Sequence, residues 1–415
     1  MAVGALVGFS EVTIFNVVIS VFVVPITQDT GWSRGTISGA VTLGGLGGGL
    51  LALTLGPVFD RFGPRYLVAS GGAIAGLSLL AVSQAQEVWQ FYVFYVASRV
   101  VGVAAISAGI NIGVSNWFVA RRSRAMGISH LGQRMGGILL PPLLQAWVAT
   151  HGWRNAWGFN AWLVLALCTI PTALFLRRRP EDHGLLPDGR SPGEALPGGP
   201  GQAAPAATGA GAVEGWSPRD ALRSRAFWHV TLAMAAAYLV FGGTNLHFMA
   251  YLLDRGIDSG TAVAAVSLFS ASSGVAGVLA GLAADRFTVR WVMTAVLALG
   301  SLSSLALTQV ASGPAALAYA LLGGAVFGGI LILSSTIYAE YFGRRSLGAI
   351  AGLAQPVTLV GNATGPGFAG AAYDLTGGYL FVFATFAVLY ALGALSLALA
   401  PAATPASARR DANTD

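Results

Sequence analysis

Long apolar stretches recur along the whole chain, and they limit the possible folds more than any other feature. Most are about 20 residues long, which at the rise of an α-helix is enough to cross the ~30 Å hydrocarbon layer of a bilayer. Charged residues make up 10% of the 415 residues, far below the ~25% of soluble domains, and the mean hydropathy is +0.68. These features predict an all-α membrane protein whose helices satisfy their own backbone hydrogen bonds.

The apolar stretches predict twelve transmembrane helices in two bundles of six. The predicted spans are 3–26, 36–59, 66–83, 88–115, a fifth that starts in the basic loop 117–127 and ends near 147, 156–176, 227–252, 262–284, 291–309, 315–338, 347–373 and 379–399. We therefore expect an N-terminal bundle (1–176), a cytoplasmic linker (177–226), a C-terminal bundle (227–400) and a disordered cytoplasmic tail (401–415). The linker is rich in Gly, Pro and Ala without apolar periodicity. In it, Ser217 followed by Pro218 predicts the start of a short surface helix.

A charged motif after the second predicted span is repeated after the eighth. The matched pairs, at one constant offset, are Gly56 and Gly281, Asp60 and Asp285, Arg61 and Arg286, Phe62 and Phe287, and Arg65 and Arg290. Such a short charged turn joins consecutive spans on one side of a membrane, and its repetition indicates a duplicated bundle. The charged members of the two loops, from Asp60 to Arg65 and from Asp285 to Arg290, are predicted to act as gates. The alternative is that they only set the topology.

The basic residues are distributed unevenly between the two sides of the predicted membrane. All 23 are arginines, and most lie on the side that carries the repeated motif, whereas only Arg34, Arg154 and Arg255 lie on the other. By the positive-inside rule, both termini are expected in the cytoplasm of a multi-pass protein of the cell (inner or plasma) membrane. The net charge of +6 is thereby explained by topology, and no nucleic-acid partner is expected.

The repeated motif also carries a resemblance to a known family. The stretch 56–65, G-P-V-F-D-R-F-G-P-R, resembles the loop between the second and third helices of the major facilitator superfamily. The stretch 281–290 resembles that family's loop between helices eight and nine, although Thr288 and Val289 replace the second Gly and the Pro. Four further segments resemble the monocarboxylate-transporter-like branch: Gly8-Phe9-Ser10, Gly31-Trp32-Ser33-Arg34, Trp117-Phe118 and Gly152-Trp153-Arg154.

The resemblance implies a fold and a mode of action. The fold is two pseudo-symmetric six-helix bundles, and the action is secondary active transport by alternating access, without a cofactor and as a monomer. Helices one, two, four and five of the first bundle would line a central cavity. The branch often carries an Asp/Arg pair in helix eight for proton coupling, but before Asp285 the polar side chains of this span are serines. A different proton carrier is therefore expected.

Four ionisable residues lie within spans of the first bundle: Glu11, Arg99, His130 and Arg134. Such residues are costly in a membrane and are candidates for function by default. One glutamate cannot neutralise two arginines, so the site keeps a charge of about +1 that a carboxylate substrate would balance. We predict that Arg134, His130 and Arg99 bind substrate and that Glu11 carries the proton. The alternatives are an Arg134–Glu11 ion pair that only ties helices together, an Arg99 that bonds backbone carbonyls, and a His130 that is merely hydrogen-bonded.

The second bundle offers polar and aromatic side chains at helical spacing. Those predicted to bind substrate are Tyr238, Asn245, Phe327, Gln355 and Asn362. The alternative for each is plain helix packing, although together they match the usual pocket of apolar walls with a few orienting polar groups. His247 is expected close to the outer end of its span, either in a gate or in a wet loop.

The predicted function is secondary active transport of a small organic anion, a carboxylate, by proton-coupled symport. One alternative is an exporter of amphipathic compounds, and another is a transport-inactive membrane sensor. We do not expect an enzyme, because the sequence contains no metal-ligand cluster, nucleophile elbow or phosphate-binding loop. The expected partners are a small anionic substrate and the lipid bilayer, with no cofactor and no metal.

Overall fold

The computed structural model describes residues 1–118, 122–178, 180, 182, 184, 216–343 and 346–401, and this part of the chain is helical without a strand. The helices of its first half are α1 (Ala2–Glu11), η1 (Val12–Ile14), α2 (Asn16–Thr30), α3 (Arg34–Phe62), α4 (Pro64–Ser83), α5 (Val88–Val101), η2 (Gly102–Ser107), α6 (Ala108–Trp117), α7 (Arg122–Val164), η3 (Leu165–Thr169) and α8 (Ile170–Phe175). Those of the second half are α9 (Pro218–Arg223), α10 (Arg225–Asp254), α11 (Ser259–Arg286), α12 (Val289–Thr308), α13 (Gly313–Phe342), α14 (Leu347–Thr376) and α15 (Leu380–Leu399).

In the described part of the chain, the helices form twelve passes, each long enough to span a membrane. Ten helical segments are long and apolar enough to span a bilayer, and one of them, Arg124–Phe175, contains a turn at Gly152, where φ is 78°. This segment therefore makes two passes. The remaining pass is α14, which is 30 residues long but rich in Gly, Pro and amide or hydroxyl side chains. The predicted all-α membrane fold with twelve transmembrane helices is confirmed.

Turn residues set where the passes begin and end. The Ser33 side chain accepts a hydrogen bond from the Thr36 N–H and caps α3. Gly63 has a φ of 79° and separates α3 from α4, whose first residue is proline. Ser217 caps α9 by accepting from the Asp220 N–H at 3.2 Å, which confirms the start predicted for this surface helix.

Three passes that were predicted as continuous helices are irregular. The first leaves the α-helix at Glu11, makes one 3₁₀ turn and becomes extended at Phe15, with φ −92° and ψ 166°. The fourth contains the π-helical segment η2 between α5 and α6, and the sixth contains the π-helical segment η3 between α7 and α8. Irregular backbone at membrane depth occurs only where protein or a cavity satisfies it, and π segments are frequent at functional sites.

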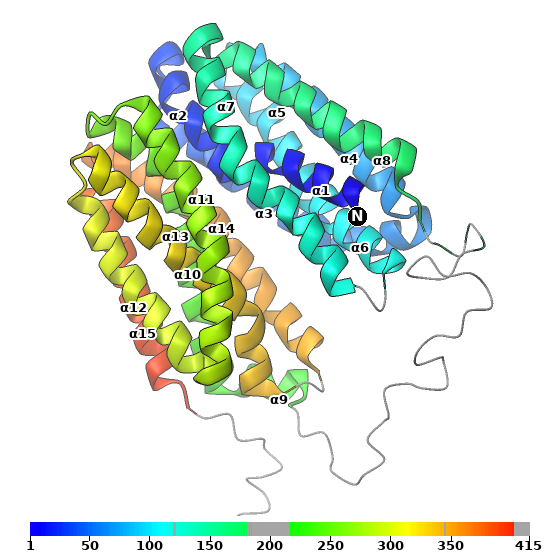
Figure 1. The fold of residues 1–415 in the computed structure, drawn as a ribbon, viewed down its shortest axis with the longest axis vertical. Helices are drawn as coiled ribbons and strands as arrows, with labels where there is room; N and C mark the ends of the chain where they lie inside the picture. The colour runs from blue at the N-terminus through cyan, green and yellow to red at the C-terminus, as the bar shows by residue number, and fades with distance from the viewer. Residues whose placement is uncertain are drawn as a thin grey trace, which may run out of the picture.

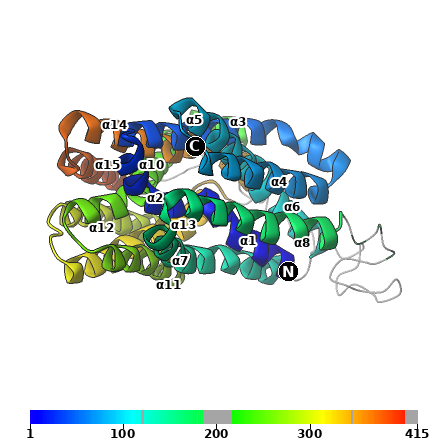
Figure 2. The same ribbon diagram turned by 90° about the horizontal axis from the view of Figure 1, so that it is seen from above.

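The helices form two groups that lie side by side. In Figure 1, α1–α8 lie in one group and α9–α15 in the other; in Figure 2, seen from above, α10–α15 lie toward the left and α1, α4, α6 and α8 toward the right. The groups meet through α3 with α14, α7 with α11, and α2 with α10. Glycines allow the first of these contacts to be close, because a Cβ on Gly45 would touch Ala363 and one on Gly49 would overlap Leu359.

The sequence repeat corresponds to equivalent contacts in the two groups. Arg65 donates to the Ala173 carbonyl at the end of α8, and Arg290 donates to the Leu397 carbonyl at the end of α15. Arg65 and Arg290 therefore each satisfy free carbonyls at the end of a neighbouring helix of their own group.

Close helix contact through glycine gives a prediction for stability. A Cβ on Gly365 of α14 would lie almost on the Leu239 carbonyl oxygen of α10. Gly365→Ala should therefore force the helices apart and lower the free energy of unfolding by about 1–3 kcal/mol. The measurement is the melting temperature of the purified protein. The matched control is Gly352→Ala in the same helix, where the new Cβ meets no atom within 4 Å; equal melting of the two variants would contradict the prediction.

Candidate functional site

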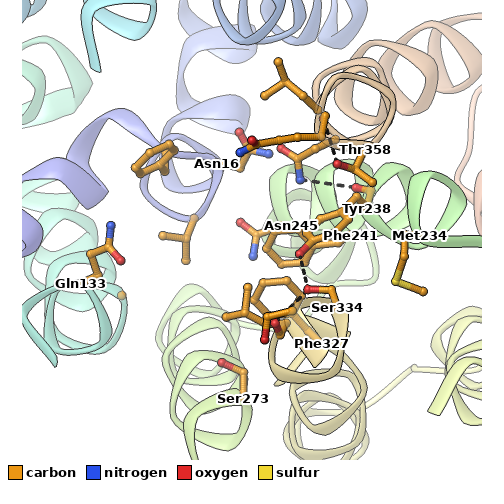
Figure 3. A pocket seen from close by; sticks show the side chains of 18 of the residues that line it. Asn16, Gln133, Met234, Tyr238, Phe241, Asn245, Ser273, Phe327, Ser334 and Thr358 are labelled. Atoms are coloured by element: carbon orange, nitrogen blue, oxygen red, sulfur yellow. Dashed lines mark hydrogen bonds between the residues drawn. The ribbon is translucent and has the colours of Figure 1, made fainter. Parts of the chain in front are cut away.

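A cavity of about 760 Å³ lies between the two groups of helices. This volume is in the range of pockets that enclose drug-sized ligands. Its walls come from η1, α2, α5 and α7 on one side and from α10, α11, α13 and α14 on the other. In Figure 3, Gln133 faces the cavity from the side opposite Phe241 and Phe327, and Asn16 and Ser273 lie between these sides.

Helix α3 contributes no side chain to the described cavity lining. The expectation that the second helix of the first bundle lines the cavity is therefore wrong, although the first, fourth and fifth do. The reason is the glycine-rich face of α3. A Cβ on Gly44 would overlap the Arg99 side chain, so α3 packs directly against α5 and α14 instead of facing an open space.

Arg134 of α7 is the cationic group with the most free hydrogen-bonding capacity in the cavity wall. It is half-buried, and its Nη1 donates to the Ser273 hydroxyl of α11 at 2.9 Å. None of the described carboxylates forms an ion pair with it. A guanidinium has five N–H donors, and a single hydrogen bond, to Ser273, is described for Arg134.

Arg99 of α5 also lines the cavity, but it holds the broken first pass. Its Nη1 donates to the Ile14 carbonyl at 2.8 Å and its Nη2 to the Asn16 side-chain oxygen at 2.7 Å. The Asn16 amide in turn donates to the Gly242 carbonyl of α10 at 3.3 Å. Arg99 thus satisfies a carbonyl that the extended Phe15 would otherwise leave unpaired, which is the contact anticipated for a structural arginine.

Glu11 lies behind the cavity wall and is 3% exposed. Its carboxylate accepts hydrogen bonds from Ser107, on the π-helical segment η2, and from the Gln133 side chain at 2.9 Å. The alternative in which Glu11 pairs with Arg134 is wrong in this structure, because neither arginine of the cavity wall forms an ion pair with it. Gln133 lines the cavity, so it connects Glu11 to the space where a substrate would bind.

His130 lies one turn from Arg134 on α7 but is exposed and does not line the cavity. Its Nδ1 is 3.1 Å from the Gln133 side-chain oxygen. The four ionisable groups expected at one polar site are therefore divided. Arg99 and Arg134 face the cavity, and Glu11 and His130 reach it through Gln133.

The residues predicted from the second bundle all line the cavity: Tyr238, Asn245, Phe327, Gln355 and Asn362. The Tyr238 hydroxyl is 3.1 Å from the Ser334 hydroxyl, and the Asn362 amide donates to the Tyr238 carbonyl at 3.4 Å. Phe327 is stacked on Phe241, with ring centroids 3.5 Å apart. Whether these residues contact a substrate remains a prediction.

The repeated motif lies at the opposite end of the molecule from Arg34, and we call this the Asp60 end. Arg178 donates to the Asp60 carbonyl at 2.7 Å, and the Arg61 guanidinium lies 5.2 Å from the centre of its neighbouring Phe62 ring. Asp285 and Arg286 are exposed. The gating role predicted for Asp60, Arg61, Arg65, Asp285, Arg286 and Arg290 remains a prediction.

At the other end, a cluster of polar side chains joins the two groups of helices. We call it the Arg34 cluster, and it consists of Arg34, Ser38, His247, Asp254 and Tyr379. Arg34 of α3 makes a bidentate ion pair with Asp254 at the end of α10, at 2.6 and 2.7 Å, and also donates to the Tyr379 hydroxyl at 2.9 Å. Such a planar two-point contact is stronger and more directional than a single ion pair.

His247 is the buried centre of this cluster and is 0% exposed. The Pro366 carbonyl can only accept, so the His247 Nε2 3.2 Å away carries the proton, and it lies 3.0 Å from the Ser38 hydroxyl. The Nδ1 then accepts from the Tyr379 hydroxyl at 2.8 Å. The wet-loop alternative for His247 is wrong, because the imidazole lies between helices.

Breaking the Arg34 cluster should expose the cavity to solvent at the Arg34 end of the molecule. In Asp254→Asn, the bidentate ion pair is lost and the buried Arg34 guanidinium keeps only weaker partners. The arrangement in which the Arg34 cluster joins the two groups of helices should then be less populated. With Asn245→Cys as reporter in a Cys168→Ser background, we expect labelling from the Arg34 end to be at least about threefold faster. The control is Asp29→Asn, which removes a carboxylate bound to Arg154 within one group of helices. Unchanged labelling in Asp254→Asn would contradict a role of this cluster in closure.

Several polar residues at the site were not singled out from the sequence. Gln133, Asn16 and Ser107 form the contacts that hold Glu11 and Arg99. Asn16 and Gln133 are amides in apolar stretches of the first bundle, which is a signal that could have identified them. Asp254 could not be paired with Arg34 from the sequence, because 220 residues separate them.

Comparisons with known proteins agree with this architecture. A model described as Major Facilitator Superfamily matches residues 4–271 and again residues 248–415. An MFS-type transporter of Gibberella moniliformis is 24% identical over 340 residues, covering 80% of this chain and 74% of that protein. Monocarboxylate transporter 13 of Bos taurus is 26% identical over 333 residues, covering 78% and 70%. The Fujikurins efflux protein of Gibberella fujikuroi is 31% identical over 136 residues, which are 33% of this chain and only 29% of that protein.

Solved structures share the fold at low sequence identity. The nucleoside transporter NupG superposes with a TM-score of 0.73 at 13% identity, covering 95% of this chain and 98% of that one. A bacterial homologue of the lysosomal transporter Spinster, in an inward-facing and occupied conformation, superposes with a TM-score of 0.67 at 17% identity, covering 95% and 91%. The family model spans both groups of helices, and the relatives include a monocarboxylate transporter. The protein is therefore a multi-pass membrane protein that belongs to the major facilitator superfamily.

Proposed function

We propose that the protein is a secondary active transporter of small organic anions, with carboxylates as substrates. The supporting observation is the charge of the cavity. Its described lining contains the guanidinium groups of Arg99 and Arg134 and not one carboxylate. A cation in the low-dielectric part of a membrane protein is costly without a compensating charge, and a carboxylate supplies that charge with a geometry that suits the arginine fork.

Arg134 is the main anion-binding residue in this proposal, and Arg99 has a supporting role. Arg99 already uses two of its nitrogens on Ile14 and Asn16, whereas Arg134 has one described hydrogen bond, to Ser273. That bond crosses between the two groups of helices, from α7 to α11. A substrate carboxylate at Arg134 would therefore bind where the two groups meet, which is where transporters of this type hold their cargo.

We propose that transport proceeds by alternating access between the two six-helix bundles, 1–176 and 227–400, joined by the linker 177–226. The Arg34 cluster would form the gate at the outer end. The loops at Asp60 and Asp285 would form the inner gate when the cavity faces outward. In the present arrangement Arg65 and Arg290 bond within their own groups, so the inner contacts would have to form during the cycle.

The proposed topology places both termini, the linker and both motif loops in the cytoplasm. Single cysteines at Asp60 and Asp285, introduced into a Cys168→Ser background, should react with an impermeant thiol reagent only from the cytoplasmic side. A cysteine at Asp258, at the Arg34 end, should react only from the outside. Labelling of either motif loop from outside would contradict the orientation. Labelling of the two loops from opposite sides would contradict the duplication as well.

The proton would be carried by Glu11. The carboxylate is buried, bonded to neutral donors and connected to the cavity through Gln133. A negative charge arriving at Arg134 favours the protonated form of a nearby carboxyl group, so anion and proton would bind together. This is symport by charge compensation, and it needs no acid in the eighth helix.

A second candidate is export of amphipathic compounds. It is supported by two relatives that are named efflux proteins, from Gibberella fujikuroi and Paecilomyces divaricatus. Under both candidates the two arginines favour anionic substrates, so the candidates differ in direction rather than in charge preference.

Uptake into proteoliposomes tests the proposed function. We expect accumulation of labelled carboxylates when a proton gradient is imposed, and none of alcohols or amines of the same size. Liposomes with the reversed gradient separate uptake from export. Transport of amines without carboxylates would overturn the proposal.

A further inference from the structure

The two sides of the cavity differ in chemistry. The charged groups, Arg99 and Arg134, come from α5 and α7, whereas α10, α11 and α13 of the other group present an aromatic wall. In this wall Phe241 is stacked on Phe327, with centroids 3.5 Å apart and planes at 4°, and Phe269 lies 6.3 Å from Phe327 at 22°. The three rings are therefore close to parallel and lie in a stack rather than in one plane, and together they form an apolar surface, which we call the phenylalanine wall.

The phenylalanine wall faces the anion-binding side across the cavity. In Figure 3, Phe241 and Phe327 lie on one side of the open space and Gln133 on the other, with Ser273 at one edge. Arg134 is the neighbour of Gln133 in α7 and bonds Ser273. A ligand with its carboxylate at Arg134 would therefore direct the rest of its body toward the wall.

The polar groups beside the wall are largely occupied with one another. Tyr238 and Ser334 are hydrogen-bonded at 3.1 Å, and Asn362 donates to the Tyr238 carbonyl. The side-chain amide of Asn245, which also lines the cavity, has no described hydrogen-bond partner and is available to a substituent on a ligand. This part of the cavity thus suits an apolar, aromatic body with few polar substituents, since a ring can pack edge-to-face or stacked against the phenylalanine wall.

The size of the cavity excludes a good fit to the smallest acids. About 760 Å³ corresponds to a drug-sized ligand, and an acid of two or three carbons would leave the phenylalanine wall in contact with water. Burial of the wall by a ligand is favourable because apolar area is removed from water. Aromatic rings gain further stabilisation from stacked or edge-to-face contact.

We propose that the substrate is an aromatic carboxylate, whose carboxylate binds Arg134 and whose ring packs against Phe241 and Phe327. This inference rests on the proposed transport of organic anions and narrows it to a substrate class. Phe241 and Phe327 are then specificity-determining residues: they select the body of the substrate, and Arg134 selects its charge.

Binding to the full-length purified protein tests this inference with four probes. These are phenylacetate, cyclohexylacetate, acetate and 2-phenylethanol. We expect phenylacetate to bind about three- to tenfold more tightly than cyclohexylacetate, which has similar bulk but no aromatic ring. Acetate and 2-phenylethanol should bind much more weakly than both, since each lacks one half of the recognised structure.

Variants separate the two halves of the site. Phe241→Leu should remove the preference for phenylacetate over cyclohexylacetate, whereas Arg134→Lys should weaken both acids to a similar degree. The matched control is Phe381→Leu on α15, because this phenylalanine is 55% exposed and does not line the cavity. Its ligand preference should equal that of the wild-type protein.

The outcomes distinguish this inference from the proposed function. If the wild-type protein bound phenylacetate and cyclohexylacetate equally tightly, or bound acetate as tightly as phenylacetate, the aromatic substrate class would be wrong. The proposed transport of organic anions would not be affected. If 2-phenylethanol bound as tightly as phenylacetate, the anion-binding role of Arg134 and the proposed function would both be wrong. Binding of the four probes to the wild-type protein tests the aromatic substrate class even if a variant fails to fold.

Discussion

Arg134→Lys is expected to lose at least about tenfold in kcat/KM for a carboxylate substrate, although the positive charge is kept. A lysine ammonium is a single point of contact, whereas the guanidinium binds a carboxylate at two points and keeps its bond to Ser273. Loss of one charge-assisted hydrogen bond accounts for a change of this size. The measurement is initial uptake into proteoliposomes over a range of substrate concentrations.

The control for Arg134→Lys is Arg255→Lys. Arg255 donates to the Thr308 carbonyl at 2.8 Å, away from the cavity, so its substitution should leave uptake unchanged. If Arg134→Lys transported like the wild-type protein, Arg134 would be a structural charge that joins α7 to α11, and the anion site would have to be sought elsewhere.

Glu11→Gln is expected to abolish accumulation against a gradient and to preserve exchange of substrate between the two sides. Glutamine cannot release a proton, but it is close to glutamate in shape and keeps an acceptor for Ser107. Turning the Gln133 amide would let that side chain accept from the new amide. The measurements are counterflow, which needs no proton, and uptake driven by an inward proton gradient.

Glu87→Gln provides the matched control for Glu11→Gln. Glu87 caps the start of α5 and is exposed, so its loss changes a helix end without reaching the cavity. Counterflow by Glu11→Gln should also become insensitive to pH in the range where the wild-type protein responds. A Glu11→Gln variant that still concentrates substrate would exclude Glu11 as the proton carrier and make His130 the next residue to replace.

Much of the fold could be predicted because each membrane pass is encoded locally. The apolar stretches, the Ser33 cap and the glycine at 63 set the helices and their ends within a few residues. The break at Phe15 could not be predicted in this way. It is stabilised by Arg99, which donates to the Ile14 carbonyl from a helix 85 residues away in the sequence. Local propensity contains no information about that contact.

The candidate site could be predicted in its residue types more than in its pairings. Buried ionisable residues stand out in an apolar sequence, which is why Arg134 and Glu11 were identified. Their partners were not, because Glu11 lies against the π-helical segment η2 and bonds Ser107 and Gln133 rather than an arginine. Which of two neighbouring residues, Gln133 or Arg134, faces Glu11 depends on the rotation of α7, and that is set by packing against α1.

The contact between α3 and α14 has a consequence for how the protein can move. Its hydrogen bonds, from the Gly367 N–H to Thr42 and from the Gly35 N–H to Asp374, are gathered toward the Arg34 end. Farther along, Gly45 and Gly49 have no side chains to interlock with α14. In the proposed transport cycle these two helices would form the pivot on which one half tilts against the other, since α3 presents no side chain at Gly45 and Gly49 that would have to be displaced. The barrier to such tilting would come from the polar contacts at the two ends of the molecule and from the substrate in the cavity between them. Substrate binding and changes in these polar contacts would therefore control the motion.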